Sequence, residues 1–235
     1  MSSRRFRAVA LAAGAGYLLG SISWADLATR RVTTGQVDLR TVGSGNPGAL
    51  NAIEILGPRW GVAVGVADIA KGVAASLVGR ALAGNIGAHV GGTAAVVGHC
   101  YPVWNGFRGG KGMSCACGQC LANFPAGVPL GIVAGGAGLL GPFERRSYGA
   151  TVFVTTTWVA ASLVWWLRGR PNAWGPAPTF GLPVATAISS AIVLRRSTPG
   201  PDCSRRARRG RMESRDPTNH GQASRRDDTT DPHDH

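Results

Sequence analysis

The sequence lacks the cysteine patterns that indicate a disulfide framework or a zinc site. Its five cysteines are Cys100, Cys115, Cys117, Cys120 and Cys203, an odd number that leaves at least one without a partner. Cys117 and Cys120 form one CxxC, but a tetrahedral zinc site usually needs a second pair, and this one opens an apolar segment. We therefore predict no metal site and interpret the cysteines as small residues that pack between helices.

Acidic residues are also scarce, because 12 Asp and Glu stand against 25 Lys and Arg, giving a formal net charge of +13. Such a charge is compatible with nucleic-acid binding, which needs clustered cations. Here, however, the cations lie between apolar runs, where the positive-inside rule places the cytosolic loops of membrane proteins. The residues concerned are Arg30, Arg31, Arg40, Arg108, Lys111, Arg145 and Arg146. We favour this second interpretation and expect no nucleic-acid partner.

Charged residues are nearly absent from several apolar runs, each long enough to cross a bilayer. These runs predict helices at about residues 7–28, 60–82, 84–104, 148–167 and 179–195. The run 113–143 is too long for one upright helix and contains Asn123, Pro125 and Pro129, so it predicts two short helices. The predicted fold is an all-α polytopic integral membrane protein with about seven transmembrane or short membrane-embedded helices, six being the alternative.

The chain ends offer no typical signal or folded domain. Arg4, Arg5 and Arg7 precede an apolar run as in a signal peptide, but no small-residue cleavage site follows, so we expect a retained first helix. Residues 197–235 contain almost no large apolar side chains and are predicted to be a disordered cytosolic tail following a membrane domain of residues 1–196. Seven segments place the loops 30–59, 105–112 and 143–147 on the side of the tail, which leaves Arg4, Arg5, Arg7, Arg168 and Arg170 outside.

Two glycine-rich segments are the candidates for chemistry. In the first, glycine can adopt positive φ, so that successive N–H groups converge on an anion, while asparagine and serine add hydrogen bonds. Its candidate residues are Gly43, Ser44, Gly45, Asn46, Gly48 and Asn51. The alternative is a tight loop that enters the next helix, and the spacing alone leaves the two equal. The second segment combines flexible backbone with two cations: Arg108, Gly109, Gly110, Lys111 and Gly112.

Three ionisable residues lie in or beside the predicted helices. Asp68 and Lys71 are three residues apart in the second helix and therefore share a face. Because charges at membrane depth must pair or face a cavity, they form either a structural ion pair or a site to which Lys71 contributes its charge. His99 precedes the second glycine-rich segment and is either a packed amphipathic residue or a proton carrier.

In content and order, these motifs resemble the bacterial acyl-phosphate:glycerol-3-phosphate acyltransferase family of integral membrane enzymes. The matching segments are Tyr17-Leu-Leu-Gly-Ser-Ile22, Asp38-Leu-Arg-Thr-Val-Gly-Ser-Gly-Asn-Pro-Gly-Ala49, Asp68-Ile-Ala-Lys-Gly72 and Gly98-His-Cys-Tyr-Pro-Val-Trp-Asn-Gly-Phe-Arg-Gly-Gly-Lys-Gly112. The resemblance covers about residues 15–195 and is strongest up to Gly112.

The resemblance implies transfer of an acyl group from acyl phosphate to the sn-1 hydroxyl of glycerol 3-phosphate, forming lysophosphatidic acid and phosphate at the cell membrane. No cofactor is implied, and the partners are the two substrates and membrane lipid; the oligomeric state is left open. Ser44, His99 and Lys111 are the implied catalytic residues, with Lys71, Arg108 and Ser147 among the phosphate-binding ones. His99, Ser44 or the acyl phosphate's own oxygen would take the hydroxyl proton.

The chain also departs from the family pattern. Glu54 stands where the family has an arginine, Leu50 replaces a threonine, and Arg195-Arg-Ser-Thr-Pro199 replaces a closing histidine and asparagine signature. Two alternatives therefore accompany the enzyme hypothesis. One is a catalytically weakened relative that binds phospholipid precursors; the other is an unrelated membrane transporter or tether.

Overall fold

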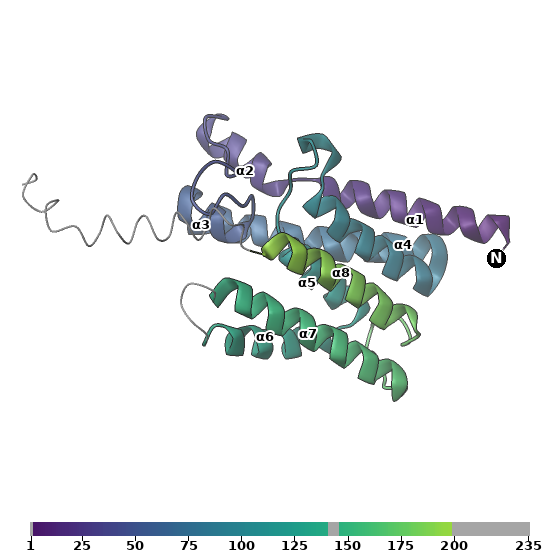
Figure 1. Ribbon diagram of the computed structural model, residues 1–235. Coiled ribbons are helices and arrows are strands. Elements are labelled where there is room, and N and C mark those ends of the chain that lie inside the picture. The colour runs from purple at the N-terminus through teal and green to yellow at the C-terminus, as the bar shows by residue number, and fades with distance from the viewer. Residues whose placement is uncertain (1, 141–145, 199–235) are drawn as a thin grey trace, which may run out of the picture. The chain divides into compact units, whose positions relative to one another are not determined.

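The computed structural model describes residues 2–140 and 146–198, and the regular elements within these ranges are all helical (Figure 1). They are α1 (Ser3–Ser21), α2 (Trp24–Thr33), α3 (Ala49–Leu56), α4 (Pro58–Cys100), the 3₁₀ helix η1 (Val103–Asn105), α5 (Met113–Asn123), α6 (Gly127–Gly138), α7 (Arg146–Leu167) and α8 (Gly181–Ser197). The predicted all-α fold is confirmed. Residues 1–197 form one compact unit, whereas the predicted tail lies almost wholly outside the described residues.

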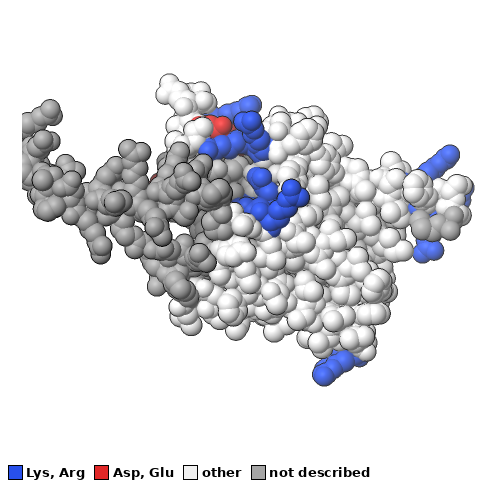
Figure 2. Space-filling view, in the orientation of Figure 1, with Lys and Arg blue, Asp and Glu red and all other residues white. Residues whose placement is uncertain are grey.

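Within the described ranges, three helical segments are long and apolar enough to cross a membrane: Ser3–Thr33, Pro58–Asn105 and Ser147–Leu167. The shorter α6 is also apolar, and its Ile132 and Val133 side chains are more than 70% exposed. Figure 2 shows a broad uncharged surface with the Lys and Arg side chains confined to a few patches. Exposed aliphatic side chains on uncharged helices are suited to contact with lipid rather than water.

Helix α4 is a hairpin of two helices rather than one continuous rod. Ala83 and Gly84 have non-helical backbone angles, with φ of −139° and 62°. Across this reversal, a Cβ atom on Gly79 would collide with the backbone of Gly87, so the two limbs touch without intervening side chains. The reversal confirms the predicted division between helices at residues 60–82 and 84–104.

The second limb of this hairpin also packs closely against α1. A Cβ on Gly16 would lie 2.8 Å from the Gly91 Cα atom, and one on Gly20 would meet the backbone of Ala95. Small residues four apart thus allow close approach of helices, as expected in membranes, where packing and not water exclusion holds helices together. The prediction of one helix over 7–28 is wrong in one respect, because extended residues Ile22 and Ser23 separate α1 from α2.

Among helices α5 to α8, most contacts join neighbours in the chain, and α8 returns to contact α4. The predicted two short helices within 113–143 are confirmed as α5 and α6, separated around Pro125. Helix α5 packs on the first limb of α4, where Gly118 faces the Ile69 carbonyl. Helices α6 and α7 pair, α8 contacts both α7 and α4, and the aromatic pair Phe124–Trp165 has ring centroids 5.5 Å apart. Cys100, Cys115 and Cys120 are buried free thiols within this packing.

Candidate functional site

A single buried asparagine shapes the first glycine-rich loop. The Asn51 Oδ1 atom accepts a hydrogen bond from the Ser44 N–H (3.0 Å), and Nδ2 donates to the carbonyls of Leu39 (2.8 Å) and Val42 (3.1 Å). Gly43 has φ of +56°, where a side chain is disfavoured and would in addition meet the Asn51 amide. Asn51 therefore fixes the loop from inside.

The surface of this loop carries the other predicted residues. Ser44 and Gly45 are exposed, and Gly45 has φ of +69°. Asn46 is half-buried with its amide beside Gly48, which is itself buried directly before α3. Ser44 is thus exposed on the loop, while the buried Asn51 organises the loop backbone.

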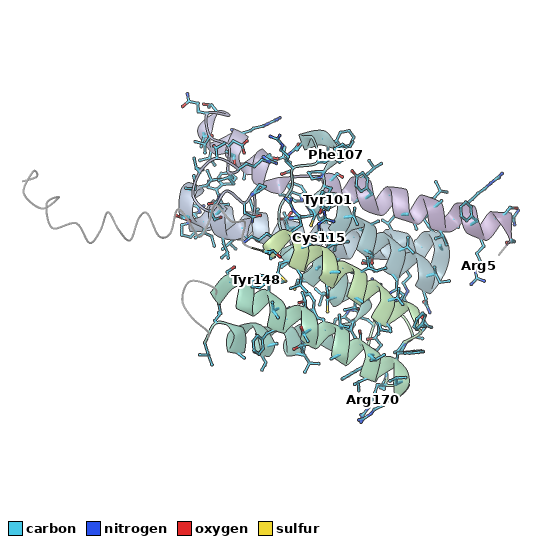
Figure 3. The ribbon with its side chains drawn as sticks, in the orientation of Figure 1. Arg5, Tyr101, Phe107, Cys115, Tyr148 and Arg170 are labelled. Carbon is cyan, nitrogen blue, oxygen red and sulfur yellow. The ribbon has the colours of Figure 1, made fainter. Side chains whose placement is uncertain are left out.

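The second glycine-rich loop folds back onto the end of α4. The Gly109 N–H donates to the Cys100 carbonyl (3.1 Å), and the Gly110 N–H donates to the His99 carbonyl (3.2 Å). These two N–H groups are consequently used within the fold. Lys111 is half-buried after them, and Arg108 is exposed before them. Tyr101 and Phe107, which mark this loop in Figure 3, lie at the opposite end of α1 from Arg5.

The two loops meet at Gly110. A Cβ atom there would lie 3.1 Å from the Pro47 carbonyl oxygen of the first loop and would collide with the His99 imidazole. A small cavity at this junction is lined by Pro47, His99, Gly110, Asp68 and Lys71, together with residues 20–25. It has space for about one water molecule. The structure therefore brings both glycine-rich motifs and all three ionisable candidates to one place.

A buried charge network underlies this junction. The Lys71 Nζ atom lies 2.9 Å from Asp68 Oδ1 and donates a 2.8 Å hydrogen bond to the Ile22 carbonyl. His99 Nδ1 lies 3.5 Å from the same carboxylate oxygen. The break between α1 and α2 leaves the Ile22 carbonyl without a helical partner, and the ammonium group supplies one. These contacts match the ion-pair interpretation of Lys71; its contact with phosphate stays a prediction.

A second ion pair, which sequence reasoning did not identify, connects α2 to both loops. The Arg40 guanidinium binds Asp26 through two hydrogen bonds of 2.7 Å and 2.9 Å, and its Nε donates to the Arg108 carbonyl (2.8 Å). The Asn105 amide donates to the same Asp26 carboxylate. Hydrogen bonding to Asp26 raises the pKa of Arg40 above its usual value. In the sequence, the one indication of this contact is the acidic Asp26 within the first apolar segment, where a charge needs a partner.

The predicted phosphate-binding residue Ser147 and the residue Glu54, which differs from the family pattern, do not line the cavity at Gly110. Ser147 is exposed at the start of α7, a helix that packs on α6 and α8. Glu54 is exposed on α3. Arg145 and the side chain of Arg146, two of the predicted loop cations, lie outside what the structure describes. The closing segment, by contrast, brings Arg196 onto the second loop, with an Nη2 distance of 2.6 Å to the Gly109 carbonyl.

Apolar helices long enough to span a bilayer, with two glycine-rich loops that meet at Gly110, define a polytopic membrane protein with a loop cluster at one end of its helices. A sequence profile described as glycerol-3-phosphate acyltransferase matches residues 10–198. The chain belongs to this family, as the sequence resemblance implied.

Individual relatives agree with this assignment. The chain is 40% identical over 114 residues to the glycerol-3-phosphate acyltransferase of Mycoplasma mycoides; the match covers 46% of this chain and 43% of the relative, so the chain spans less than half of that protein's length. It is also similar to the crystal structure of PlsY, an integral membrane glycerol 3-phosphate acyltransferase. The glycerol 3-phosphate form matches with 29% identity, a TM-score of 0.63 and coverage of 80% of this chain and 87% of PlsY. The lysophosphatidic acid form matches with 27% identity, a TM-score of 0.64 and coverage of 86% and 93%.

Proposed function

We propose that this protein transfers an acyl group from acyl phosphate to the sn-1 hydroxyl of glycerol 3-phosphate, releasing lysophosphatidic acid and inorganic phosphate. The observation that carries the proposal is the junction at Gly110, where the two glycine-rich motifs contact each other above His99. Family membership and the two PlsY forms support the same reaction. Because both substrates carry phosphate, two adjacent loops with nearby cations can hold electrophile and nucleophile together.

In this reaction the glycerol hydroxyl oxygen attacks the acyl carbonyl carbon, and the bond from that carbon to the phosphate oxygen breaks. Lys111 and Arg108 would balance the charge of the departing phosphate. His99 is 8% exposed and its Nδ1 faces the Asp68 carboxylate, which favours an orienting role over a mobile proton carrier. The hydroxyl proton would then pass to a phosphate oxygen of the donor, either directly or through the Ser44 hydroxyl, which would give up its own proton as it accepts one, and the donor phosphate leaves as inorganic phosphate.

The location within the cell also belongs to this proposal. The protein would lie in the cell membrane with its loops and tail in the cytosol, because Arg30, Arg31 and Arg40 lie on the loop side. Arg5 and Arg170 lie at the other end of the helices (Figure 3) and weaken the charge asymmetry. Single cysteines introduced at Phe107 and Arg5 in a cysteine-free background should be labelled by a membrane-impermeant thiol reagent only from the cytosolic and outer sides, respectively. The reverse pattern would invert the orientation.

Transfer of a labelled acyl group from acyl phosphate to glycerol 3-phosphate by purified, lipid-embedded protein tests the reaction. Lys111→Ala should abolish most product, since the departing phosphate would lose one of the two cations of the second loop. Arg59→Gln, at an exposed arginine at the start of α4, is the matched control for loss of one positive charge. If well-folded wild-type protein forms no lysophosphatidic acid, the proposal fails.

The exposed Glu54 defines the competing candidate, a weakened relative that only binds phospholipid precursors. An anion there would repel a phosphate approaching over α3. If Glu54→Arg raises turnover about tenfold or more from a low wild-type rate, the chain is such a weakened relative. A wild-type rate in the ordinary enzymatic range removes this candidate.

A further inference from the structure

The last turn of α8 contacts the second glycine-rich loop through one arginine. The Arg196 Nη2 atom donates a 2.6 Å hydrogen bond to the Gly109 carbonyl, and Nε donates a 3.3 Å bond to the Gly110 carbonyl. The guanidinium carbon also lies 5.4 Å from the centre of the Tyr101 ring. Arg196 is half-buried in this position, whereas the preceding Arg195 is exposed.

With these contacts the Gly109–Gly110 peptide group is hydrogen-bonded at both its C=O and its N–H. The N–H groups of Gly109 and Gly110 are already bonded to the end of α4, so α4 holds one side of the loop and Arg196 holds the carbonyls. In a trans peptide, the C=O and the following N–H point in opposite directions. A guanidinium bound to the Gly110 carbonyl therefore directs the Lys111 N–H away from itself and sets where the Lys111 side chain begins.

Arginine suits this task better than lysine. Its planar guanidinium presents several donors at fixed angles and stacks on aromatic rings, so it can bind two successive carbonyls and lie over Tyr101 at once. Charge-assisted hydrogen bonds to carbonyls are stronger than neutral ones. Glycine, by contrast, has no side chain to restrict the backbone at positions 109 and 110. Hydrogen bonds from Arg196 to the two glycine carbonyls restrict the backbone conformation that the glycines themselves leave free.

We propose that Arg196 is a positioning residue that holds the Gly109–Lys111 backbone in the geometry needed to receive a substrate phosphate. This inference rests on the proposed acyl transfer for its consequence, but the contact itself is independent of turnover. It assigns a role to the closing segment Arg195-Arg-Ser-Thr-Pro199, which stands in place of the histidine and asparagine signature.

The test compares Arg196→Gln and Arg196→Lys with Arg195→Gln, which removes the same charge one residue away. The first readout is hydrogen exchange of the loop 101–112 in lipid-embedded protein. Arg196→Gln should speed exchange in this loop about tenfold or more while leaving the loop 38–48 unchanged, since a charged hydrogen bond contributes about that factor. Arg195→Gln should leave both loops as in the wild type. Unchanged exchange of the 101–112 loop in Arg196→Gln would overturn the proposal.

The second readout is the kinetics of acyl transfer. Arg196→Gln should lower kcat about tenfold or more with only a small fall in melting temperature, and Arg196→Lys should recover part of kcat because it keeps the charge without the planar guanidinium. A stable Arg196→Gln with wild-type kcat and KM would also overturn the proposal. If the wild type has no activity but Arg196→Gln loosens the loop, the clamp is supported and the proposed reaction is the part that fails.

Discussion

Replacing Gly110 by alanine is the most direct test of the contact between the two motifs. The added methyl would overlap the His99 imidazole and lie 3.1 Å from the Pro47 carbonyl oxygen, closer than ordinary contact. Gly110 is not among the residues with positive φ, so the backbone itself accepts alanine. The effect of Gly110→Ala would therefore come from crowding and not from backbone strain.

The size of the effect follows from the displacement required. To reach normal van der Waals contact the His99 imidazole must shift by roughly 1 Å and the Pro47 carbonyl by a few tenths of an ångström, and overpacking of this kind costs about 1–3 kcal/mol of stability. A misplacement of about 1 Å beside the reacting groups lowers kcat about 100-fold. We therefore expect Gly110→Ala to lose about 100-fold in kcat while remaining folded.

Acyl-transfer kinetics and a melting temperature, measured on the same lipid-embedded preparations, check this expectation. Gly14→Ala in α1 is the matched control, because a Cβ there meets nothing within 4 Å and alanine favours a helix. It should keep both wild-type activity and stability. Wild-type kcat in Gly110→Ala would show that the junction does not hold the reacting groups.

Three further substitutions test the polar network. Asn51→Ala removes three hydrogen bonds inside the first loop and should cost about 2–4 kcal/mol, seen as a lower melting temperature; an unchanged value would contradict the shaping role. Asp26→Asn weakens the bond to Arg40, so it should lower kcat/KM several-fold with little loss of stability, and a fully active variant would argue against this connection. Lys71→Met leaves Asp68 buried without its ammonium partner and should cost about 3–5 kcal/mol. Adding Asp68→Asn to it should restore part of the melting temperature, and failure to do so would place the effect elsewhere.

The helices were largely predictable because their signals are local. Charge-free runs of bilayer length gave the spans, and the residues Asn123 and Pro125 gave the division between α5 and α6. The break at Ile22–Ser23 was not predictable in this way. The Ile22 carbonyl at this break accepts its hydrogen bond from Lys71, which lies 49 residues further along the chain.

The site was predictable in its motifs but not in its contacts. Glycine, serine and asparagine within one short segment indicated a shaped loop, yet nothing in the spacing distinguishes an asparagine that holds the loop, such as Asn51, from one that faces a ligand. Arg196 was interpreted only as part of a missing signature, because its contact with Gly110 joins residues 86 apart. Long-range polar contacts of this kind leave no periodic pattern in the sequence.

The hairpin of α4 determines which residues face each other at the far end of its limbs. Asp68 precedes Ala83 by 15 residues, and His99 follows Gly84 by the same number. The turn thus lies roughly 22 Å along the helix from the ionisable pair that it aligns. Inserting one residue in either limb would rotate one partner by about 100° relative to the other. The position of this turn in the sequence therefore determines whether Asp68 and His99 face each other, although the turn itself takes no part in the charge network.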